Sequence, residues 1–167
     1  GVSGGIDSAV NAALYATVLP PENILLVNMP SCYNSQTTKG LAKELADNLG
    51  CLYTVIPVQD SLELTRSQFS SAMLYQKDKP LGHLQLTSFI EENIQARDRS
   101  SRILAAAAAA FGGVFTCNAN KAESSVGYAT LYGDSAGFLA ATADLWKHQV
   151  YDLARYLNDS VFKREVV

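Results

Sequence analysis

Short apolar runs alternate along the chain with longer segments whose apolar residues recur at helical spacing. Residues 24–29, 51–56 and 114–117 are apolar runs bounded by breaker or polar residues, and they predict buried β-strands. Strands separated by helices favour a parallel sheet with helices against its faces. We therefore predict an α/β fold of Rossmann-like type, with an open, mostly parallel sheet flanked by helices.

Helical periodicity predicts helices in the segments 8–18, 37–49, 60–75, 90–111 and 144–157. The first stops before two prolines, the second ends at Gly50 and the fourth ends at Gly112. Asp144 is the expected cap of the last helix. Residues 77–82 are predicted to form a loose loop, and the six alanines at 105–110 a tight contact between a helix and the sheet.

Polar stretches occupy residues 3–8, 30–36 and 118–137, in each case where a strand should end. In an open parallel sheet the carboxyl ends of the strands lie along one edge, and ligands bind beyond that edge. We therefore expect the three stretches to contribute to one ligand site.

The stretch SGGIDS at residues 3–8 has the layout of a phosphate-binding turn that leads into a helix. Its glycines allow backbone N–H groups to converge on an anion at the helix N-terminus. No Gly-Lys-Ser/Thr sequence ends it, so it is not a Walker loop and no lysine balances the phosphate charge. Asp7 indicates instead a divalent cation such as Mg²⁺ held against a polyphosphate. The alternative is an ordinary Gly-Gly turn in which Asp7 or Ser8 caps the helix.

Length, charge and cysteine content narrow the class of protein. The formal net charge is −3 and no basic run occurs, so neither nucleic acid nor an anionic membrane is expected as the main partner. No apolar stretch reaches membrane-spanning length, and three cysteines without zinc-type spacing favour a reduced, cytoplasmic protein. Because only Gly1 and Val2 precede the phosphate loop, we expect residues 1–167 to form a single domain that is incomplete at both ends.

Three further segments carry charged or aromatic residues, each with a structural alternative. Glu123 follows a predicted strand, and it either joins Asp7 at a metal ion or caps a helix. Composition alone favours Arg97 as a solvent-facing charge on its helix. The loop 127–137 is equally compatible with a surface turn anchored by tyrosines. Lys147 stands in the first turn of a predicted helix, where it opposes the helix dipole, which indicates a purpose other than stability.

Several of these segments resemble the NAD synthetases, a family within the N-type ATP pyrophosphatase superfamily. SGGIDS at residues 3–8 is similar to the SGGxDS loop of the whole superfamily. ENIQARDR at 92–99 resembles the ENIQARxR helix of the NAD synthetases, and NANKAE at 118–123 resembles their GTGNKSE-type loop. The last two segments are more specific to the family than the first.

Two more segments extend the resemblance over nearly the whole chain. GYATLYGDSAG at 127–137 is similar to the family's GYxTxYGDxxG loop, and DLWKHQV at 144–150 is similar to its DLxKxxV element. MPSCYNS at 29–35 looks like the MPSxYSS stretch of the longer, glutamine-dependent members. The resemblance implies an adenine nucleotide alpha hydrolase-like sheet, which agrees with the fold predicted from the pattern.

The resemblance also implies roles for individual residues. ATP would be bound by Ser3, Gly4, Gly5, Asp7, Ser8, Asn118 and Lys147. Deamido-NAD would be bound by Asn93, Arg97, Tyr132 and Asp134, and Mg²⁺ by Asp7 and Glu123. Asp7 and Lys147 would act in catalysis, the lysine by stabilising charge on the transferring phosphate. The chain departs from the family at Asn118, where the family has a phosphate-contacting threonine, and at 140–141, where the usual proline is missing.

Finally, the resemblance implies a reaction and its partners. The nicotinate carboxylate of deamido-NAD attacks the α-phosphate of ATP and releases pyrophosphate, and ammonia then displaces AMP to give NAD. The ammonia would come free or from a glutaminase domain upstream, and the family implies a homodimer. Two alternatives stay open: another N-type ATP pyrophosphatase such as GMP synthetase, or a non-catalytic nucleotide-binding module on a similar fold.

Overall fold

A short parallel sheet forms the centre of the computed structural model, which describes residues 1–32 and 35–167. Strand β1 (Leu25–Asn28) pairs in parallel with β2 (Leu52–Val55). Val2 forms a parallel bridge to the last residue of β1, and its N–H donates to the carbonyl of the residue before. The predicted α/β fold with parallel pairing is confirmed.

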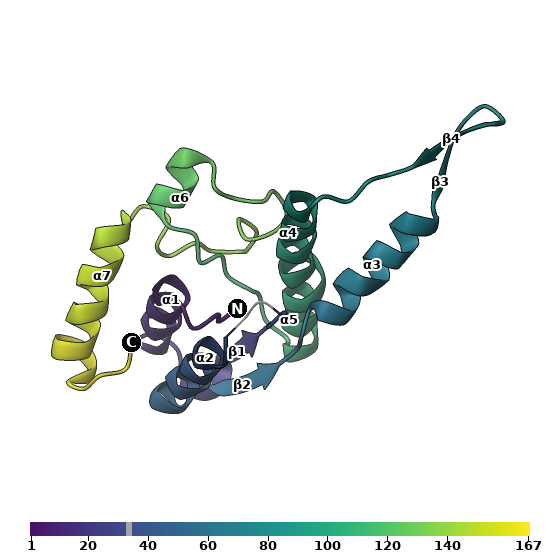
Figure 1. The fold of residues 1–167 in the computed structure, drawn as a ribbon. Helices are drawn as coiled ribbons and strands as arrows, with labels where there is room; N and C mark the ends of the chain where they lie inside the picture. Colours follow the sequence, from purple (N-terminus) through teal and green to yellow (C-terminus); the bar gives the residue numbers. More distant parts are fainter. Residues whose placement is uncertain (33–34) are drawn as a thin grey trace.

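Three helices pack together on one face of this sheet. Helices α1 (Ile6–Ala16) and α2 (Gln36–Leu49) pack together, and α7 (Lys147–Tyr156) packs against α1 (Figure 1). Alternate residues of β1 serve the two faces of the sheet, because successive strand side chains point in opposite directions. Leu26 belongs to the core of α1, α2 and α7, whereas Val27 belongs to a second core on the other face.

A long helix covers that second face. It comprises α4 (Ser88–Arg97), a π-helical segment (Asp98–Leu104) and α5 (Ala105–Phe111), and it ends at Gly112, as predicted, in the left-handed conformation. The expected contact through the six alanines is limited, because α5 has no buried residue and Ala107 is the one alanine of the six that packs against the second core. The buried contacts come from the larger side chains at the end of the π-helical segment, which pack against Val27.

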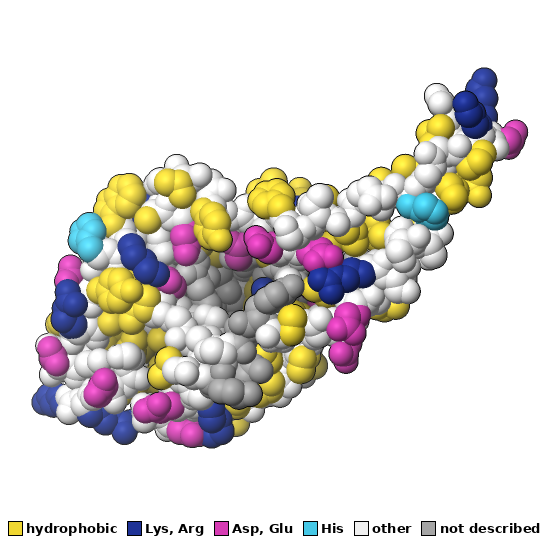
Figure 2. Space-filling view, viewed as in Figure 1, with side chains coloured by type: hydrophobic (Ala, Val, Ile, Leu, Met, Phe, Trp, Pro, Cys, Tyr) yellow, Lys and Arg dark blue, Asp and Glu magenta, His cyan; other side chains and the backbone are white. Residues whose placement is uncertain are grey.

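A hairpin replaces the predicted end of the third helix and the predicted loose loop. Helix α3 (Gln59–Ser71) stops four residues before the predicted end, and β3 (Met73–Gln76) pairs antiparallel with β4 (Lys79–His83). The turn between the strands places Lys77 at a positive φ of 52°. The hairpin projects from the body as an arm, with apolar side chains along its length and basic side chains at its tip (Figures 1 and 2).

The predicted strand at 114–117 is wrong, although the segment is hydrogen bonded. Phe138 N donates to Phe115 O and Cys117 N donates to Leu139 O, both at 2.9 Å, so its partner is a loop and not a strand. Gly137, at a φ of +153°, allows this close approach, since a Cβ there would lie 2.3 Å from Cys117 N. The segment therefore runs beside the sheet without extending its ladder.

The C-terminal part contains a helix that the sequence pattern did not predict. Helix α6 (Lys121–Val126) begins after Asn120, whose side chain forms a reciprocal capping box with Glu123. Helix α7 begins at Lys147 after Trp146 as N-cap, so the prediction of Asp144 as its cap is wrong. In the described ranges no helix is both long and apolar enough to cross a membrane. A 3₁₀ turn (Pro21–Asn23) and a π-helical turn (Leu157–Phe162) complete the secondary structure.

Candidate active site

Two serines fold the phosphate loop onto the first turn of α1. The Ser8 hydroxyl donates to Gly5 O at 2.9 Å and accepts from Ser3 N at 3.2 Å, and the Ser3 hydroxyl accepts from Gly5 N at 3.3 Å. The N-cap of α1 is Gly5, without a side-chain capping bond, so the alternative in which Asp7 or Ser8 is the N-cap is wrong. Both residues lie inside the first turn, where the helix dipole favours a bound anion.

Gly4 is required where the loop meets α2. Its φ is +84°, and a Cβ at this position would lie 2.3 Å from the carbonyl oxygen of Thr38 in α2. Both the backbone conformation and the lack of space exclude a larger residue. The N-terminal turns of α1 and α2 are thus held close together beside the loop.

The carboxylate of Asp7 is the meeting point of three distant segments. Asn120 donates from its side-chain amide to Asp7 Oδ1 at 3.0 Å, and Lys147 forms an ion pair with Asp7 Oδ2. The side chain of Asp7 is 20% exposed and that of Lys147 is 42% exposed, so solvent reaches the pair. Two residues predicted to act in catalysis are therefore in direct contact.

The position of Glu123 is compatible with both roles that the sequence left open. Its carboxylate accepts from Asn120 N at 3.2 Å, which is the capping role, and it also lines the same cavity as Asp7. In the described ranges no group of three His, Cys, Asp or Glu residues could hold a metal ion. Two hard carboxylates nevertheless fit Mg²⁺, which commonly takes one or two carboxylates and completes its shell with phosphate oxygens and water.

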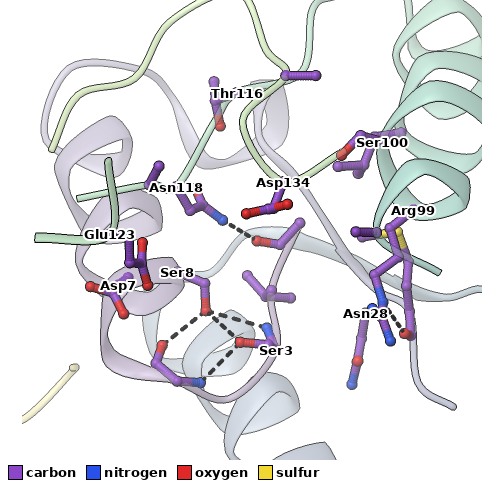
Figure 3. A pocket seen from close by; sticks show the side chains of 18 residues that line it. Ser3, Asp7, Ser8, Asn28, Arg99, Ser100, Thr116, Asn118, Glu123 and Asp134 are labelled. Atoms are coloured by element: carbon purple, nitrogen blue, oxygen red, sulfur yellow. Dashed lines mark hydrogen bonds between the residues drawn. The ribbon is translucent and has the colours of Figure 1, made fainter. Parts of the chain in front are cut away.

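These groups line a cavity of about 410 Å³ (Figure 3). Of the residues predicted to bind ATP or Mg²⁺, those that line it are Ser3, Gly5, Asp7, Ser8, Asn118 and Glu123. Asn118 is held in place by a 2.7 Å hydrogen bond from its amide to Gly1 O. Lys147 reaches the cavity wall through its ion pair with Asp7. The structure thus brings the first and third polar stretches together, as expected, although the residues 114–117 that precede the third stretch are not a strand.

The residues predicted to bind deamido-NAD join the loop 127–137 to α4. Thr130 Oγ1 donates to Asn93 Oδ1 at 2.9 Å, and Arg97 Nε donates to Leu131 O at 3.2 Å. Thr130 N also donates to Asp134 Oδ1 at 2.8 Å, and Asp134 lines the cavity. Asn93 and Arg97 therefore hold the loop at the cavity mouth in this structure.

Tyr132 and Gly133 occupy special positions in the same loop. Tyr132 has a positive φ of 62° and a side chain that is 75% exposed, outside the cavity lining. Its carbonyl accepts a 2.5 Å hydrogen bond from Ser101. A Cβ at Gly133 would lie 3.0 Å from the carbonyl carbon of Ala96, so the loop packs closely on α4.

Sequence reasoning missed several polar residues of the cavity. Asn28 ends β1 and lines the cavity floor, and a polar residue closing an apolar strand was the available signal. Arg99 also lines the cavity and donates from Nε to Met29 O at 3.3 Å. Burial lowers the pKa of Arg99, and the charge of Asp98 partly offsets that effect. Arg99 brings a cation to a wall otherwise rich in carboxylates.

The MPSCYNS stretch can be placed only in part, because Tyr33 and Asn34 lie outside the described residues. Ser31, three residues after the end of β1, is buried, and Cys32 N donates to Gln59 Oε1 at 3.2 Å. The described part of the stretch therefore connects the end of β1 to the start of α3.

Comparison with known proteins identifies the family of the chain. The family model described as NAD synthase matches residues 1–166. The glutamine-dependent NAD(+) synthetase of Synechocystis sp. is 42% identical over 160 residues, which cover 95% of this chain and 26% of that protein. That of Aquifex aeolicus is 40% identical over 158 residues, with 95% and 26% covered. The chain thus spans about a quarter of the length of these curated relatives.

Solved structures with the same fold include three enzymes. A glutamine-dependent NAD+ synthetase from Acinetobacter baumannii, in complex with ADP, matches with a TM-score of 0.86 and 31% identity over 100% of this chain and 30% of its own. An NH3-dependent NAD synthetase from Campylobacter jejuni matches with 0.81 and 32% over 95% and 62%. An NMN synthetase from Francisella tularensis matches with 0.80 and 29% over 98% and 63%.

These matches decide between the families that the phosphate loop alone left open. They cover nearly the whole chain and include the loop, the α4 helix and the 127–137 segment. GMP synthetase or a non-catalytic nucleotide-binding module is therefore not favoured. The chain belongs to the NAD synthase family.

Proposed function

We propose that this chain performs the ATP-dependent amidation of deamido-NAD to NAD. The observation that carries the proposal is the Asp7 carboxylate on the wall of the cavity, in contact with Lys147 and Asn120 and beside the phosphate loop. A carboxylate, a cation and a helix N-terminus at one point suit a polyphosphate and its counter-ion. Membership of the NAD synthase family supports the substrate.

In the first step, the nicotinate carboxylate oxygen bonds to the α-phosphorus of ATP, and the bond from that phosphorus to the bridging oxygen breaks. Pyrophosphate leaves and an adenylate remains. Ammonia then bonds to the carbonyl carbon, AMP leaves, and the nitrogen loses a proton. Because carboxylates are poor acyl donors, the adenylate supplies the leaving group that amide formation needs.

The residues of the cavity divide this work by position. The first turn of α1 and the loop before it would hold the phosphates, and Lys147 would neutralise charge that develops on them. Asp7 and Glu123 would hold Mg²⁺, which supplies charge neutralisation and polarisation of phosphate oxygens when bound. Asn93, Arg97, Tyr132 and Asp134 would place the dinucleotide, since they lie on or against the loop at the cavity mouth.

The test is ATP–pyrophosphate exchange that depends on deamido-NAD and Mg²⁺. Asp7→Asn and Glu123→Gln should each reduce the exchange rate strongly and raise the Mg²⁺ concentration needed for half-maximal rate. Asp47→Asn is a matched control, because its carboxylate pairs with Lys43 on the exposed face of α2. If either site variant keeps full Mg²⁺-dependent exchange, the metal assignment fails. A binding module would show no exchange at all.

A mononucleotide substrate is the second candidate, because one of the neighbouring structures is an NMN synthetase. The same cavity would then activate the nicotinate carboxylate of the mononucleotide. Exchange measured in parallel with deamido-NAD and with nicotinate mononucleotide separates the two. We expect a higher kcat/KM for deamido-NAD, and a preference for the mononucleotide would replace the first candidate with the second.

Nitrogen source, assembly and location complete the proposal. The glutamine-dependent relatives support glutamine as the source of ammonia, delivered by a glutaminase unit. Product formation with glutamine and with ammonium chloride, measured on the complete enzyme, tests this point.

We further propose a homodimer in a reducing cytoplasm, which agrees with the three free cysteines. Light scattering that gives a monomeric mass would contradict the dimer.

A further inference from the structure

Buried hydrogen bonds tie α1 to two segments on the other side of the site. The side-chain amide of Asn11 donates to Asp7 O at 2.9 Å and to Thr142 Oγ1 at 2.8 Å. The Thr142 hydroxyl donates in turn to Ala119 O at 3.1 Å. Asn11 is 1% exposed and Thr142 is 0% exposed. We call these three hydrogen bonds the Asn11–Thr142 relay.

The direction of every bond in the relay is determined. The backbone carbonyls of Asp7 and Ala119 only accept, so the amide nitrogen of Asn11 must face the first and the hydroxyl hydrogen of Thr142 the second. The Thr142 oxygen is then left to accept from Asn11. The Asn11 side-chain oxygen, in contrast, is buried without a hydrogen-bond partner among the described residues.

That orphaned oxygen argues against a role in stability alone. A buried polar atom without a partner costs stability, and an apolar pair of similar shape avoids the cost. Neither Asn11 nor Thr142 is among the residues that line the cavity. The two side chains therefore neither line the cavity nor optimise the core.

What the relay joins explains its presence. One end is the backbone of Asp7, whose carboxylate is held by Asn120 and Lys147. The other end is the carbonyl of Ala119, the residue before Asn120. The middle is Thr142, whose carbonyl accepts from Leu145 N at 3.0 Å in the turn that leads to α7. The relay thus connects all three segments whose side chains meet at the Asp7 carboxylate.

We propose that Asn11 and Thr142 are positioning residues, which hold Asp7, Asn120 and Lys147 in the geometry that adenylation requires. This inference rests on the proposed amidation reaction. A displacement of about 1 Å between such groups lowers the rate on the order of 100-fold. Loss of the hydrogen bonds of the relay should therefore have a measurable effect on kcat.

The experiment compares four forms of the complete enzyme: the wild type, Thr142→Val, Thr142→Ser, and the double variant Asn11→Leu with Thr142→Val. Thr142→Val keeps the shape and removes the hydroxyl, whereas Thr142→Ser keeps the hydroxyl. Each form is measured for kcat per folded molecule in deamido-NAD-dependent exchange, for the KM of deamido-NAD, and for stability in urea.

We expect Thr142→Val to lower kcat about 10- to 100-fold with an unchanged KM for deamido-NAD, because Asn93 and Arg97 lie on separate elements. Thr142→Ser should retain the wild-type kcat. The double variant should recover the stability lost in Thr142→Val, since both polar partners are gone, but not its kcat. If Thr142→Val does not fold, the double variant against the wild type carries the same comparison.

Two results overturn the inference. One is a wild-type kcat per folded molecule in Thr142→Val, and the other is a double variant in which kcat returns together with stability. Either would reduce the relay to a structural role while leaving the proposed reaction intact. A wild-type enzyme without any exchange would instead remove the proposed reaction, and the inference with it.

Discussion

The side-chain amide of Asn120 donates a 3.0 Å hydrogen bond to the carboxylate of Asp7, a residue 113 positions away in the sequence. The oxygen of the same amide accepts from Glu123 N at 3.1 Å and so caps α6. With 1% of its surface exposed, Asn120 cannot exchange either partner for water without rearrangement. The backbone N–H of Asn120 also donates to the carboxylate of Glu123, so this one residue contacts both carboxylates that we propose as ligands of Mg²⁺.

Substitutions of Asn120 should separate these two contacts. Asn120→Ala removes both, and the lost cap alone should lower the free energy of unfolding by about 1 kcal/mol. Asn120→Asp keeps an acceptor for Glu123 N but replaces the donor to Asp7 with a like charge. We expect it to lower exchange activity at least about 10-fold, and its buried charge beside Asp7 should lower the free energy of unfolding at least as much as Asn120→Ala does. An Asn120→Asp enzyme with full activity would show that the contact to Asp7 is dispensable.

Lys147 should contribute to rate more than to stability. Its ion pair with Asp7 is partly solvent-exposed, and pairs of that kind stabilise little. Removal of a group that stabilises transition-state charge typically costs about 100- to 1,000-fold in kcat, and we expect a loss of that size for Lys147→Met. Lys121→Met is the control, because Lys121 lies over the Trp146 ring at 5.1 Å and does not contact Asp7. Equal losses in the two variants would contradict a specific role.

Two glycine substitutions should change stability in opposite directions. Gly4→Ala places a Cβ 2.3 Å from Thr38 O at a φ of +84°, and it should lower the free energy of unfolding by at least about 2 kcal/mol. Gly40→Ala lies inside α2 with no atom within 4 Å of the new Cβ, and it should raise the same quantity by about 0.5–1 kcal/mol. Urea unfolding of both variants is the measurement. A neutral Gly4→Ala would mean that the loop and α2 can separate freely.

The pair between Arg66 and Glu91 should make stability depend on acidity. Arg66 Nε donates to Glu91 Oε1 at 2.6 Å, and this hydrogen bonding lowers the pKa of Glu91 below its ordinary value of 4.5. The unfolded chain then binds the proton more readily, so the stabilisation is complete above about pH 4.5 and is lost as pH falls through the lower, folded pKa.

Glu91→Gln tests that linkage between α3 and α4. The stability difference between the wild type and Glu91→Gln should be largest above pH 5 and should shrink as pH falls below 4, because protonation removes the charge that the variant lacks. Glu92→Gln is the neighbouring control, since Glu92 has no ion pair in the described part of the chain. A difference that is constant with pH would show that the pair does not titrate as described.

The parts of the fold that sequence reasoning predicted are those that local signals determine. β1, β2, α2 and the long helix follow from apolar runs and from breakers such as Gly50 and Gly112. The hairpin β3–β4 was missed because its strands contact no core and its turn at Lys77 lacks the glycine or asparagine that predicts one. α6 was missed although Asn120, followed three residues later by Glu123, has capping-box spacing.

The candidate site could likewise be predicted only in part. Asp7, Asn118 and Asp134 lie in the polar stretches that were predicted to follow strands, and they line one cavity. A shared edge of strand ends does not account for all three, because residues 114–117 form no strand. The contacts that organise these residues could not be predicted, because they join positions far apart in sequence. An asparagine inside the apolar run of α1 was the one local sign of the relay through Thr142.

The π-helical segment of the long helix has a consequence for how the cavity mouth is aligned. Asn93, Arg97 and Ser101 all bond the 130–132 stretch, and they stand four residues apart. In a regular α-helix each step of four residues turns about 40° past a full revolution, so a third contact would drift around the helix. A π-helical turn holds more residues per revolution and corrects the azimuth between Arg97 and Ser101. The π-helical turn therefore keeps the residues before and after it on the same side of the helix. A one-residue deletion within it would rotate one half of the helix out of alignment with the other.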